Sequence, residues 1–168
     1  MGDKEIRLVA VDVDGTLTDG AMIYDYSGNV SKRFYVRDGL GVKLLQAAGL
    51  DVAWVTSDAA TATIKRAERL GVRHCLAGVT DKVSAVQGLC EEIGISLGET
   101  AFLGDDLQDL DVMQAVGLPA AVGDAHRMIK SVAVFHCVSG GGFGAFREFA
   151  EHLLAARGED LKSLMSRL

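Results

Sequence analysis

The sequence predicts an α/β protein with a doubly wound parallel sheet, helices on both faces and a protruding β-hairpin. Short β-branched apolar runs alternate along the chain with segments of helical periodicity. The crossovers between successive runs are about a dozen residues or longer, which is enough to join parallel strands. Hydrophobic residues make up 49% of the 168 positions and are spread evenly, so we expect a single domain over residues 1–168.

The strands are predicted where short apolar runs end in polar residues. Residues 6–13, IRLVAVDV, are typical of a strand buried on both faces of a parallel sheet. Residues 22–26 and 31–36 alternate around a turn with glycine and asparagine, which predicts the hairpin over about 20–36. Further strands are predicted at residues 51–56, 72–78, 100–105, 118–123 and 132–138.

Helices are predicted between these strands, and glycines mark where several of them end. Apolar residues recur at helical spacing after Arg37 until Gly49, and a second helix ends at Gly71. Asp81 is expected to cap a third helix, which Gly94 ends. Further helices are expected at 107–115, 125–131 and 143–157, with a mobile glycine turn at 140–144 and a tail at 158–168 that can fray.

Composition excludes several classes of partner. A net charge of −6 and only 6% aromatic residues argue against a nucleic-acid surface. No window contains the roughly 18 uncharged apolar residues that a membrane span needs. The N-terminal residues lack the order of features of a secretory signal, so we expect a cytoplasmic protein. Cys75, Cys90 and Cys137 suit reduced core thiols, and a small molecule is the expected partner.

Polar residues follow three of the predicted strands. Because the carboxyl ends of parallel strands meet at one edge of the sheet, these side chains are expected to lie together. Four carboxylates at one edge repel each other unless a cation is present, and oxygen ligands suit Mg²⁺. A lysine and a hydroxyl at the same edge could hold the oxygens of a phosphoryl group. The residues are Asp12, Asp14, Thr56, Ser57, Lys82, Asp105 and Asp106.

The order and spacing of these residues resemble a known superfamily over about the whole chain. DVDGT (12–16), Thr56, Lys82 and GDDLQD (104–109) are similar to the four motifs of the haloacid dehalogenase-type phosphatases. The hairpin with YVRDGLGV (35–42) and the segment 139–158 resemble the small capless sugar-acid phosphatases, notably those acting on 3-deoxy-manno-octulosonate 8-phosphate. The resemblance implies a Rossmann-like fold and a Mg²⁺-dependent phosphatase.

The resemblance also implies a role for each motif residue. Asp12 would attack the phosphorus as a nucleophile and form an aspartyl-phosphate. Asp14 would protonate the leaving oxygen and later activate the water that cleaves the intermediate. Thr56 and Lys82 would bind the phosphoryl oxygens.

The implied magnesium ligands are Asp12, the main-chain carbonyl of Asp14, and Asp105. Asp106 and Asp109 would orient ligands and waters from just outside the ligand shell.

The substrate is less well defined by the sequence. The predicted contacts are Arg37, Gly39, Ser57, Asp58, Arg66 and Arg69. A glycine and an arginine are expected after the motif threonine in the octulosonate phosphatases, whereas this chain has Ser57 and Asp58. With Arg66 and Arg69, this arrangement is closer to phosphatases of nononic, sialic-type acid 9-phosphates. Arg66 and Arg69 could equally be ordinary charges on a solvent-facing helix.

The chain has no room for a cap domain. Only 39 residues separate Thr16 from Thr56, and 48 separate Thr56 from Asp105. An open site admits water, so another subunit is expected to cover it, in a tetramer like those of the resembling family. The hairpin could pair with its copies, or instead pack on its own domain. Its apolar residues are Met22, Ile23, Tyr24, Phe34 and Tyr35.

Two functions from other classes stay open. The chain could be a catalytically silent oligomerisation module, although its intact motif residues argue against this. It could also be a receiver-like signalling domain, which uses an acidic pocket, a hydroxyl and a lysine. There, however, an aspartate ends a middle strand, where this chain has Thr56.

Overall fold

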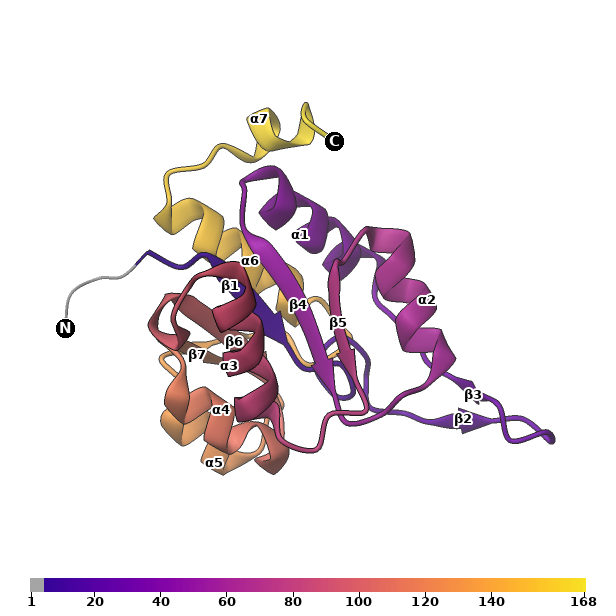
Figure 1. Ribbon diagram of the computed structural model, residues 1–168. Coiled ribbons are helices and arrows are strands. Elements are labelled where there is room, and N and C mark those ends of the chain that lie inside the picture. Colours follow the sequence, from indigo (N-terminus) through magenta and orange to yellow (C-terminus); the bar gives the residue numbers. More distant parts are fainter. Residues whose placement is uncertain (1–4) are drawn as a thin grey trace.

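The computed structural model describes residues 5–168 and has the predicted α/β architecture (Figure 1). Six parallel strands form one sheet in the order β5-β4-β1-β6-β7-β8. The chain runs outward from the central β1 to β5, crosses back to β6, and then runs outward to β8, which is a doubly wound topology. The strands are β1 (Leu8–Val11), β4 (Asp51–Thr56), β5 (His74–Ala77), β6 (Thr100–Gly104), β7 (Leu118–Ala121) and β8 (Phe135–His136).

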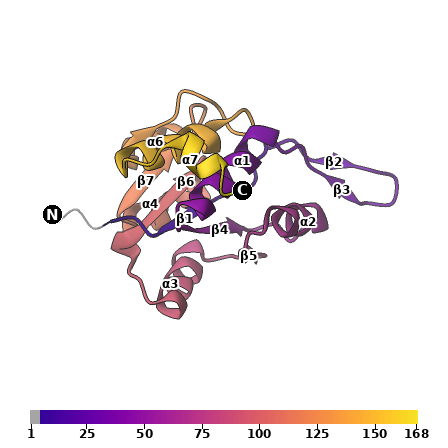
Figure 2. The same cartoon turned by 90° about the horizontal axis from the view of Figure 1, so that it is seen from above.

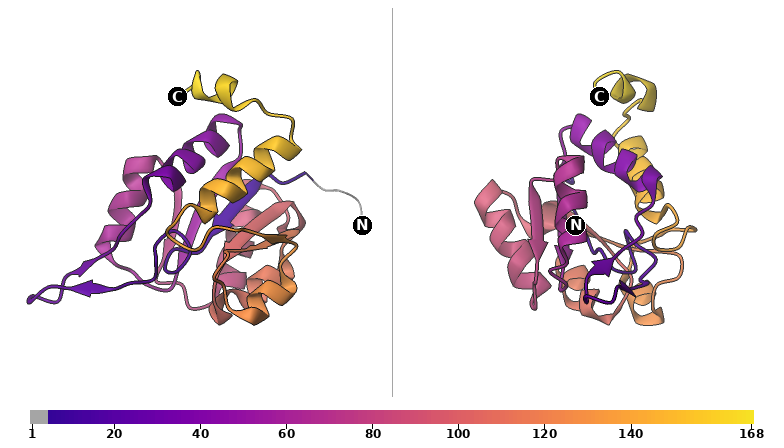
Figure 3. Two further views of the ribbon diagram at one scale, coloured as in Figure 1. Left: turned by 180° about the vertical axis from the view of Figure 1, so that it is seen from behind. Right: turned by 90° about the vertical axis from the view of Figure 1, so that its right-hand side faces the viewer.

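Helices cover both faces of the sheet (Figures 2 and 3). One face carries α1 (Val36–Ala47), α2 (Thr61–Leu70) and α6 (Ala145–Ala156), and α7 (Leu161–Met165) packs on α1 beyond the end of the sheet. The other carries α3 (Lys82–Ile93), α4 (Leu110–Ala115) and α5 (Arg127–Val132). The 3₁₀ turns η1 (Leu97–Glu99) and η2 (Leu107–Asp109) flank β6. Strands β1, β4 and β6 are buried almost completely, because helices shield both of their faces from water.

The predicted hairpin extends away from the domain as β2 (Ile23–Tyr24) and β3 (Val30–Ser31) (Figure 1). Its strands are solvent-exposed, with 59% of Ile23 and 65% of Tyr24 accessible. Its base is attached to the domain, since the ring of Phe34 stacks on Trp54 at 5.8 Å. Phe34, which the sequence suggested for contacts between copies, therefore packs on its own domain.

The C-terminal residues are more regular than the sequence indicated. Instead of a fraying tail, residues 161–165 form α7, and the Leu164 side chain is completely buried. Asp160 caps this helix by accepting a hydrogen bond from the Ser163 N–H at 2.8 Å. The hairpin projects from the layered domain (Figure 1). Within residues 5–168, no helix is both long and apolar enough to cross a bilayer.

Candidate active site

The chain makes a tight turn where β1 ends. The carbonyl of Val13 accepts hydrogen bonds from the N–H groups of Leu17 at 2.9 Å and Thr18 at 3.0 Å. Gly15 has a φ of +95°, and a Cβ atom there would overlap the carboxylate of Asp105. The glycine of DVDGT is therefore required both by its backbone conformation and by the close approach of the turn after β6.

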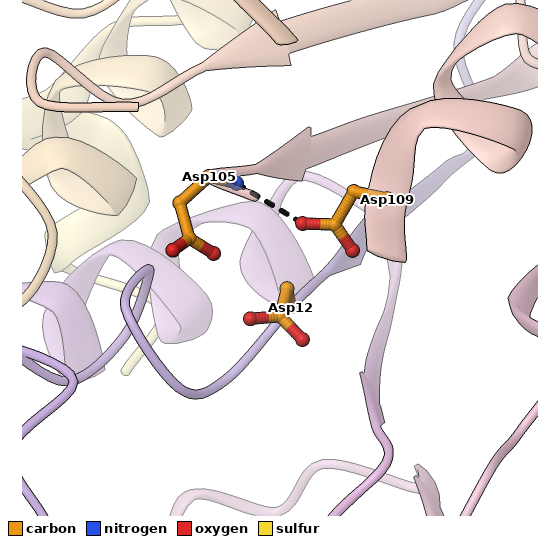
Figure 4. A group of neighbouring side chains, drawn as sticks. All are labelled: Asp12, Asp105 and Asp109. Atoms are coloured by element: carbon orange, nitrogen blue, oxygen red, sulfur yellow. Dashed lines mark hydrogen bonds between the residues drawn. The ribbon is translucent and has the colours of Figure 1, made fainter. Parts of the chain in front are cut away.

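Three carboxylates meet at the carboxyl edge of the sheet (Figure 4). Asp12 follows β1, Asp105 follows β6 and Asp109 ends η2. Each offers one oxygen, and these three oxygens all lie within 4.8 Å of one another. Asp109 also accepts a hydrogen bond from the N–H of Asp105 at 3.0 Å, which ties the turn after β6 together.

Lys82 bridges two of these carboxylates from the first turn of α3. Its Nζ lies 2.5 Å from Oδ1 of Asp12 and 2.6 Å from Oδ1 of Asp109. Burial acts to lower the pKa of Lys82, but the charges of Asp12 and Asp109 outweigh it and raise that pKa above its ordinary value. The lysine is therefore a buried cation held between two acids.

The cluster carries more negative than positive charge. Burial and the charge of Asp109 raise the pKa of Asp12 well above its usual value, and the same two causes raise the pKa of Asp105 to about 6. Three carboxylates and one ammonium leave a formal charge of −2 when all are ionised. A divalent cation with oxygen ligands would balance that charge, so these residues fit Mg²⁺.

Asp14 lies on the other side of the same pocket. Its Oδ2 accepts a hydrogen bond from the Thr56 hydroxyl at 3.3 Å and from Nζ of Lys32 at 2.8 Å. Its Oδ1 is buried and has no hydrogen-bond partner among the described residues. The pocket has a volume of about 140 Å³ and is lined by Asp12, Asp14, Thr56, Ser57, Lys82, Asp105, Asp106, Gln108 and Asp109.

The structure thus brings eight of the predicted site residues together around one pocket. Asp109 lies deeper than the sequence suggested, because its carboxylate is a member of the acidic triad and only 1% exposed. The side chain of Asp14 is not in that triad and faces Lys32 and Thr56 instead.

Five of the six proposed substrate contacts do not line this pocket in the described chain. Arg37 lines a separate cavity of about 530 Å³ beside Tyr35 and Phe143. Gly39 faces Arg66, which lies half-buried between α1 and α2. Arg69 is exposed on α2. The remaining proposed contact outside the pocket, Asp58, forms an ion pair with Lys32 at 2.5 Å.

Sequence reasoning did not find three residues of the site. Lys32 contacts Asp14, the hydroxyl of Thr16 donates to Asp105 at 3.1 Å, and Gln108 accepts from the Ser57 hydroxyl at 3.1 Å. Thr16 and Gln108 stand inside the two acidic motifs, so their positions were a usable signal. Lys32 stands in the hairpin, where no pattern marks a side chain that turns back to the sheet.

The glycine turn at 140–144, expected to be mobile, packs tightly on the turn after β1. The N–H of Gly142 donates to the carbonyl of Thr16 at 3.0 Å. A Cβ atom on Gly141 would overlap the carbonyl oxygen of Gly15. The turn thus supports the backbone that carries Asp12 and Asp14.

Comparison with known proteins gives consistent matches. A family profile described as haloacid dehalogenase-like hydrolase matches residues 75–140. The chain is 40% identical over 157 residues to 3-deoxy-D-manno-octulosonate 8-phosphate phosphatase KdsC of Haemophilus influenzae, covering 93% of this chain and 87% of that protein.

Solved structures agree with this sequence match. The phosphatase of the same name from Moraxella catarrhalis, in complex with magnesium ion, phosphate ion and KDO, has a TM-score of 0.89 at 38% identity, over 92% of this chain and 88% of that one. The cobalt-bound enzyme from H. influenzae has a TM-score of 0.89 at 37% identity, and the match covers 92% of this chain and 91% of that one.

A doubly wound sheet with an acidic pocket at its carboxyl edge, and no cap domain in residues 5–168, defines a small haloacid dehalogenase-like phosphatase. The chain belongs to the KdsC family of this superfamily and is a phosphoric monoester hydrolase. This result excludes the silent module and the receiver domain as its function.

Proposed function

We propose that the enzyme removes the terminal phosphate of a 2-keto-3-deoxy sugar acid, 3-deoxy-D-manno-octulosonate 8-phosphate, in a Mg²⁺-dependent reaction. The observation that carries the proposal is the buried bridge of Lys82 between Asp12 and Asp109, in a pocket that also holds Asp14. The choice of substrate is supported by the names of the relatives and by the magnesium, phosphate and KDO in the Moraxella structure.

We assign the magnesium to Asp12, Asp105 and the main-chain carbonyl of Asp14. Both oxygens of Asp109 already accept hydrogen bonds, from Lys82 and from the N–H of Asp105. Asp109 would therefore hold these groups in place, and the exposed Asp106 would orient waters. Magnesium bound there would neutralise part of the negative charge on the phosphoryl oxygens.

The side chains then have separate tasks in the two halves of the reaction. The carboxylate of Asp12 forms a bond to phosphorus while the bond from phosphorus to the sugar oxygen breaks, and Asp14 gives its proton to that oxygen. The products are the sugar acid and an aspartyl-phosphate at Asp12. A water that gives its proton to Asp14 then attacks the phosphorus, which releases phosphate and restores both acids. Thr56 and Lys82 hold the phosphoryl oxygens throughout.

The sugar is proposed to extend from the pocket past Ser57, which lies at its rim. Arg37, Gly39, Arg66 and Arg69 remain proposed contacts for the sugar acid, although none lines the pocket in the described chain. The alternative nononate substrate was suggested by Asp58 together with Arg66 and Arg69, and by the absence of an arginine after the motif threonine. Because the Asp58 carboxylate is paired with Lys32, Asp58 does not favour the nononate.

The test is a phosphate-release assay with octulosonate 8-phosphate and nononate 9-phosphate, each with Mg²⁺ and with EDTA. We expect faster release from the octulosonate, dependence on Mg²⁺, and no turnover by the Asp12→Asn variant. A higher kcat/KM for the nononate would replace the substrate assignment. Absence of phosphate release from both would contradict the whole proposal.

We also propose that the enzyme is a homo-oligomer, a tetramer in which the hairpins of neighbouring copies pair. The exposed apolar side chains of Met22, Ile23 and Tyr24 support this, since isolated hairpins seldom leave such residues in water. A neighbouring copy over the open pocket would exclude water from the sugar phosphate.

A further inference from the structure

Lys32 connects the hairpin to the pocket. It directly follows β3, and its side chain has 0% solvent exposure. Its Nζ lies 2.8 Å from Oδ2 of Asp14 and 2.5 Å from Oδ2 of Asp58. A lysine side chain without solvent exposure is rare in proteins unless it is paired, and this one contacts two carboxylates.

The two oxygens of the Asp14 carboxyl have different surroundings. Oδ2 accepts hydrogen bonds from Lys32 and from the Thr56 hydroxyl. Oδ1 is buried without a hydrogen-bond partner among the described residues, and Asp14 lines the pocket. Two donors on one oxygen restrict rotation of the carboxyl group, because rotation would break both hydrogen bonds.

We propose that Lys32 is a positioning residue for the reaction: it fixes the orientation of the Asp14 carboxyl, so that Oδ2 stays occupied and Oδ1, which has no hydrogen-bond partner among the described residues, is the oxygen left to exchange the proton. This inference rests on the proposed function, in which Asp14 exchanges a proton with the sugar oxygen. Lys32 itself touches neither the substrate nor the reacting atoms.

Asp58 anchors this arrangement on its other side. Its carboxylate holds Lys32, and its N–H donates to the Thr56 hydroxyl oxygen at 3.2 Å. Asp58 thus holds both of the groups that donate to Asp14 Oδ2. We assign it this supporting task in place of the substrate contact that the sequence suggested.

A direct role of Lys32 in binding the sugar carboxylate fits the structure less well. Its side chain has no exposed surface, and its ammonium already contacts two carboxylates. Burial acts to lower the pKa of Lys32, but the carboxylates of Asp14 and Asp58 beside its ammonium outweigh it and raise that pKa. The lysine is therefore charged and occupied.

The test compares two leaving groups in the Lys32→Met variant. The sugar oxygen needs a proton to leave, whereas p-nitrophenolate leaves without one, and kcat/KM reports only the steps up to release of this first product. We expect kcat/KM for the sugar phosphate to fall about tenfold or more, and that for p-nitrophenyl phosphate to fall less than about threefold.

The matched control is Arg33→Met. Arg33 is the next residue of the hairpin and is also ion-paired, but to Asp19 and away from the pocket. We define the ratio as kcat/KM for the sugar phosphate divided by kcat/KM for p-nitrophenyl phosphate, and we expect it to be unchanged in this variant. If Lys32→Met does not fold, Asp58→Asn can be used instead, because it removes the charge that pairs with the same lysine. We expect it to lower the ratio as well.

The outcomes separate this inference from the proposed function. A wild-type enzyme that does not release phosphate from the sugar phosphate contradicts the proposed function. An active wild-type enzyme whose ratio is unchanged in Lys32→Met, or in Asp58→Asn where that variant is used, contradicts the positioning role alone.

Discussion

Nζ of Lys82 lies 2.5 Å from Oδ1 of Asp12, although the two residues are 70 positions apart in the chain. The topology explains the contact. Asp12 directly follows the central strand β1, and Lys82 begins α3 in the connection from β5 to β6, so both residues lie at the carboxyl edge of the sheet. The sheet topology therefore brings together two residues that lie far apart in the sequence.

Replacing Lys82 by methionine is expected to lower both activity and stability. The change leaves Asp12 and Asp109 buried without their cation, which costs about 3–5 kcal/mol for a buried pair. Urea unfolding with EDTA measures the loss, and phosphate release measures the activity. Lys65→Met, at an exposed pair with Glu68 on α2, should change stability by less than about 1 kcal/mol. Equal stability of the two variants would show that Lys82 is not needed to balance the acids.

Magnesium is expected to raise the melting temperature of the wild-type enzyme, because an ion that binds only the folded chain stabilises it. Asp105→Asn should remove most of this shift, since it takes one carboxylate from the triad. Asp111→Asn, an exposed aspartate on α4, is the control and should keep the shift. Differential scanning fluorimetry at several Mg²⁺ concentrations gives the comparison. If Mg²⁺ raises the melting temperature of Asp105→Asn as much as that of wild type, the ion does not bind at Asp105.

Much of the fold could be predicted because its signals are local. β4 was predicted at residues 51–56, the observed bounds, since the apolar run stops at a polar residue on its carboxyl side. Gly71 and Gly94 end α2 and α3 in the left-handed conformation, as expected. β8 is shorter than predicted, because Val132 belongs to α5 and only Phe135–His136 pair at the sheet edge.

Site residues could be predicted where they stand at the ends of strands. Residues that reach the site only through side-chain packing could not be predicted. Asp12, Thr56 and Asp105 follow directly from the topology. Lys32 was missed, because nothing in a hairpin of exposed residues shows which side chain is buried. Arg66 is on the face of α2 that meets Gly39 of α1, a contact between helices that single-sequence periodicity does not define.

Asp38 is expected to make stability depend on pH. It lies in the first turn of α1 with 3% exposure, and its Oδ1 accepts the Arg147 N–H at 2.8 Å. Burial raises its pKa from 3.8 to about 6. The folded chain therefore binds this proton more tightly than the unfolded chain, so stability falls as pH rises from about 4 to 6.

In Asp38→Asn, the free energy of unfolding should decrease less between about pH 4 and 6 than it does in wild type. The variant should therefore be more stable than wild type at pH 7, by at most about 3 kcal/mol. Urea unfolding between pH 4 and 8 measures the difference, with Glu92→Gln on the exposed face of α3 as the control. If wild type and Asp38→Asn keep the same difference in stability at every pH, the carboxyl does not titrate in this range.

Ile23→Glu is expected to dissociate the proposed tetramer, since it places a charge in the apolar part of the hairpin. Sedimentation velocity should show smaller species, and activity should fall because the pocket loses its cover. Val138→Glu is the control, since Val138 is 92% exposed and lies outside the hairpin. A wild-type enzyme that sediments as a monomer would disprove the assembly.

Gly141→Ala is expected to lower activity more than its small size suggests. The added methyl group would overlap the carbonyl oxygen of Gly15, so the turn carrying Asp14 must move. Displacements of about 1 Å at a catalytic group can cost roughly 100-fold in rate. Gly88→Ala, in α3 with no atom within 4 Å of the new methyl group, should instead keep full activity and gain up to about 1 kcal/mol in stability. Phosphate release and urea unfolding on both variants decide the matter: equal activity would mean that the glycine turn does not support the turn after β1.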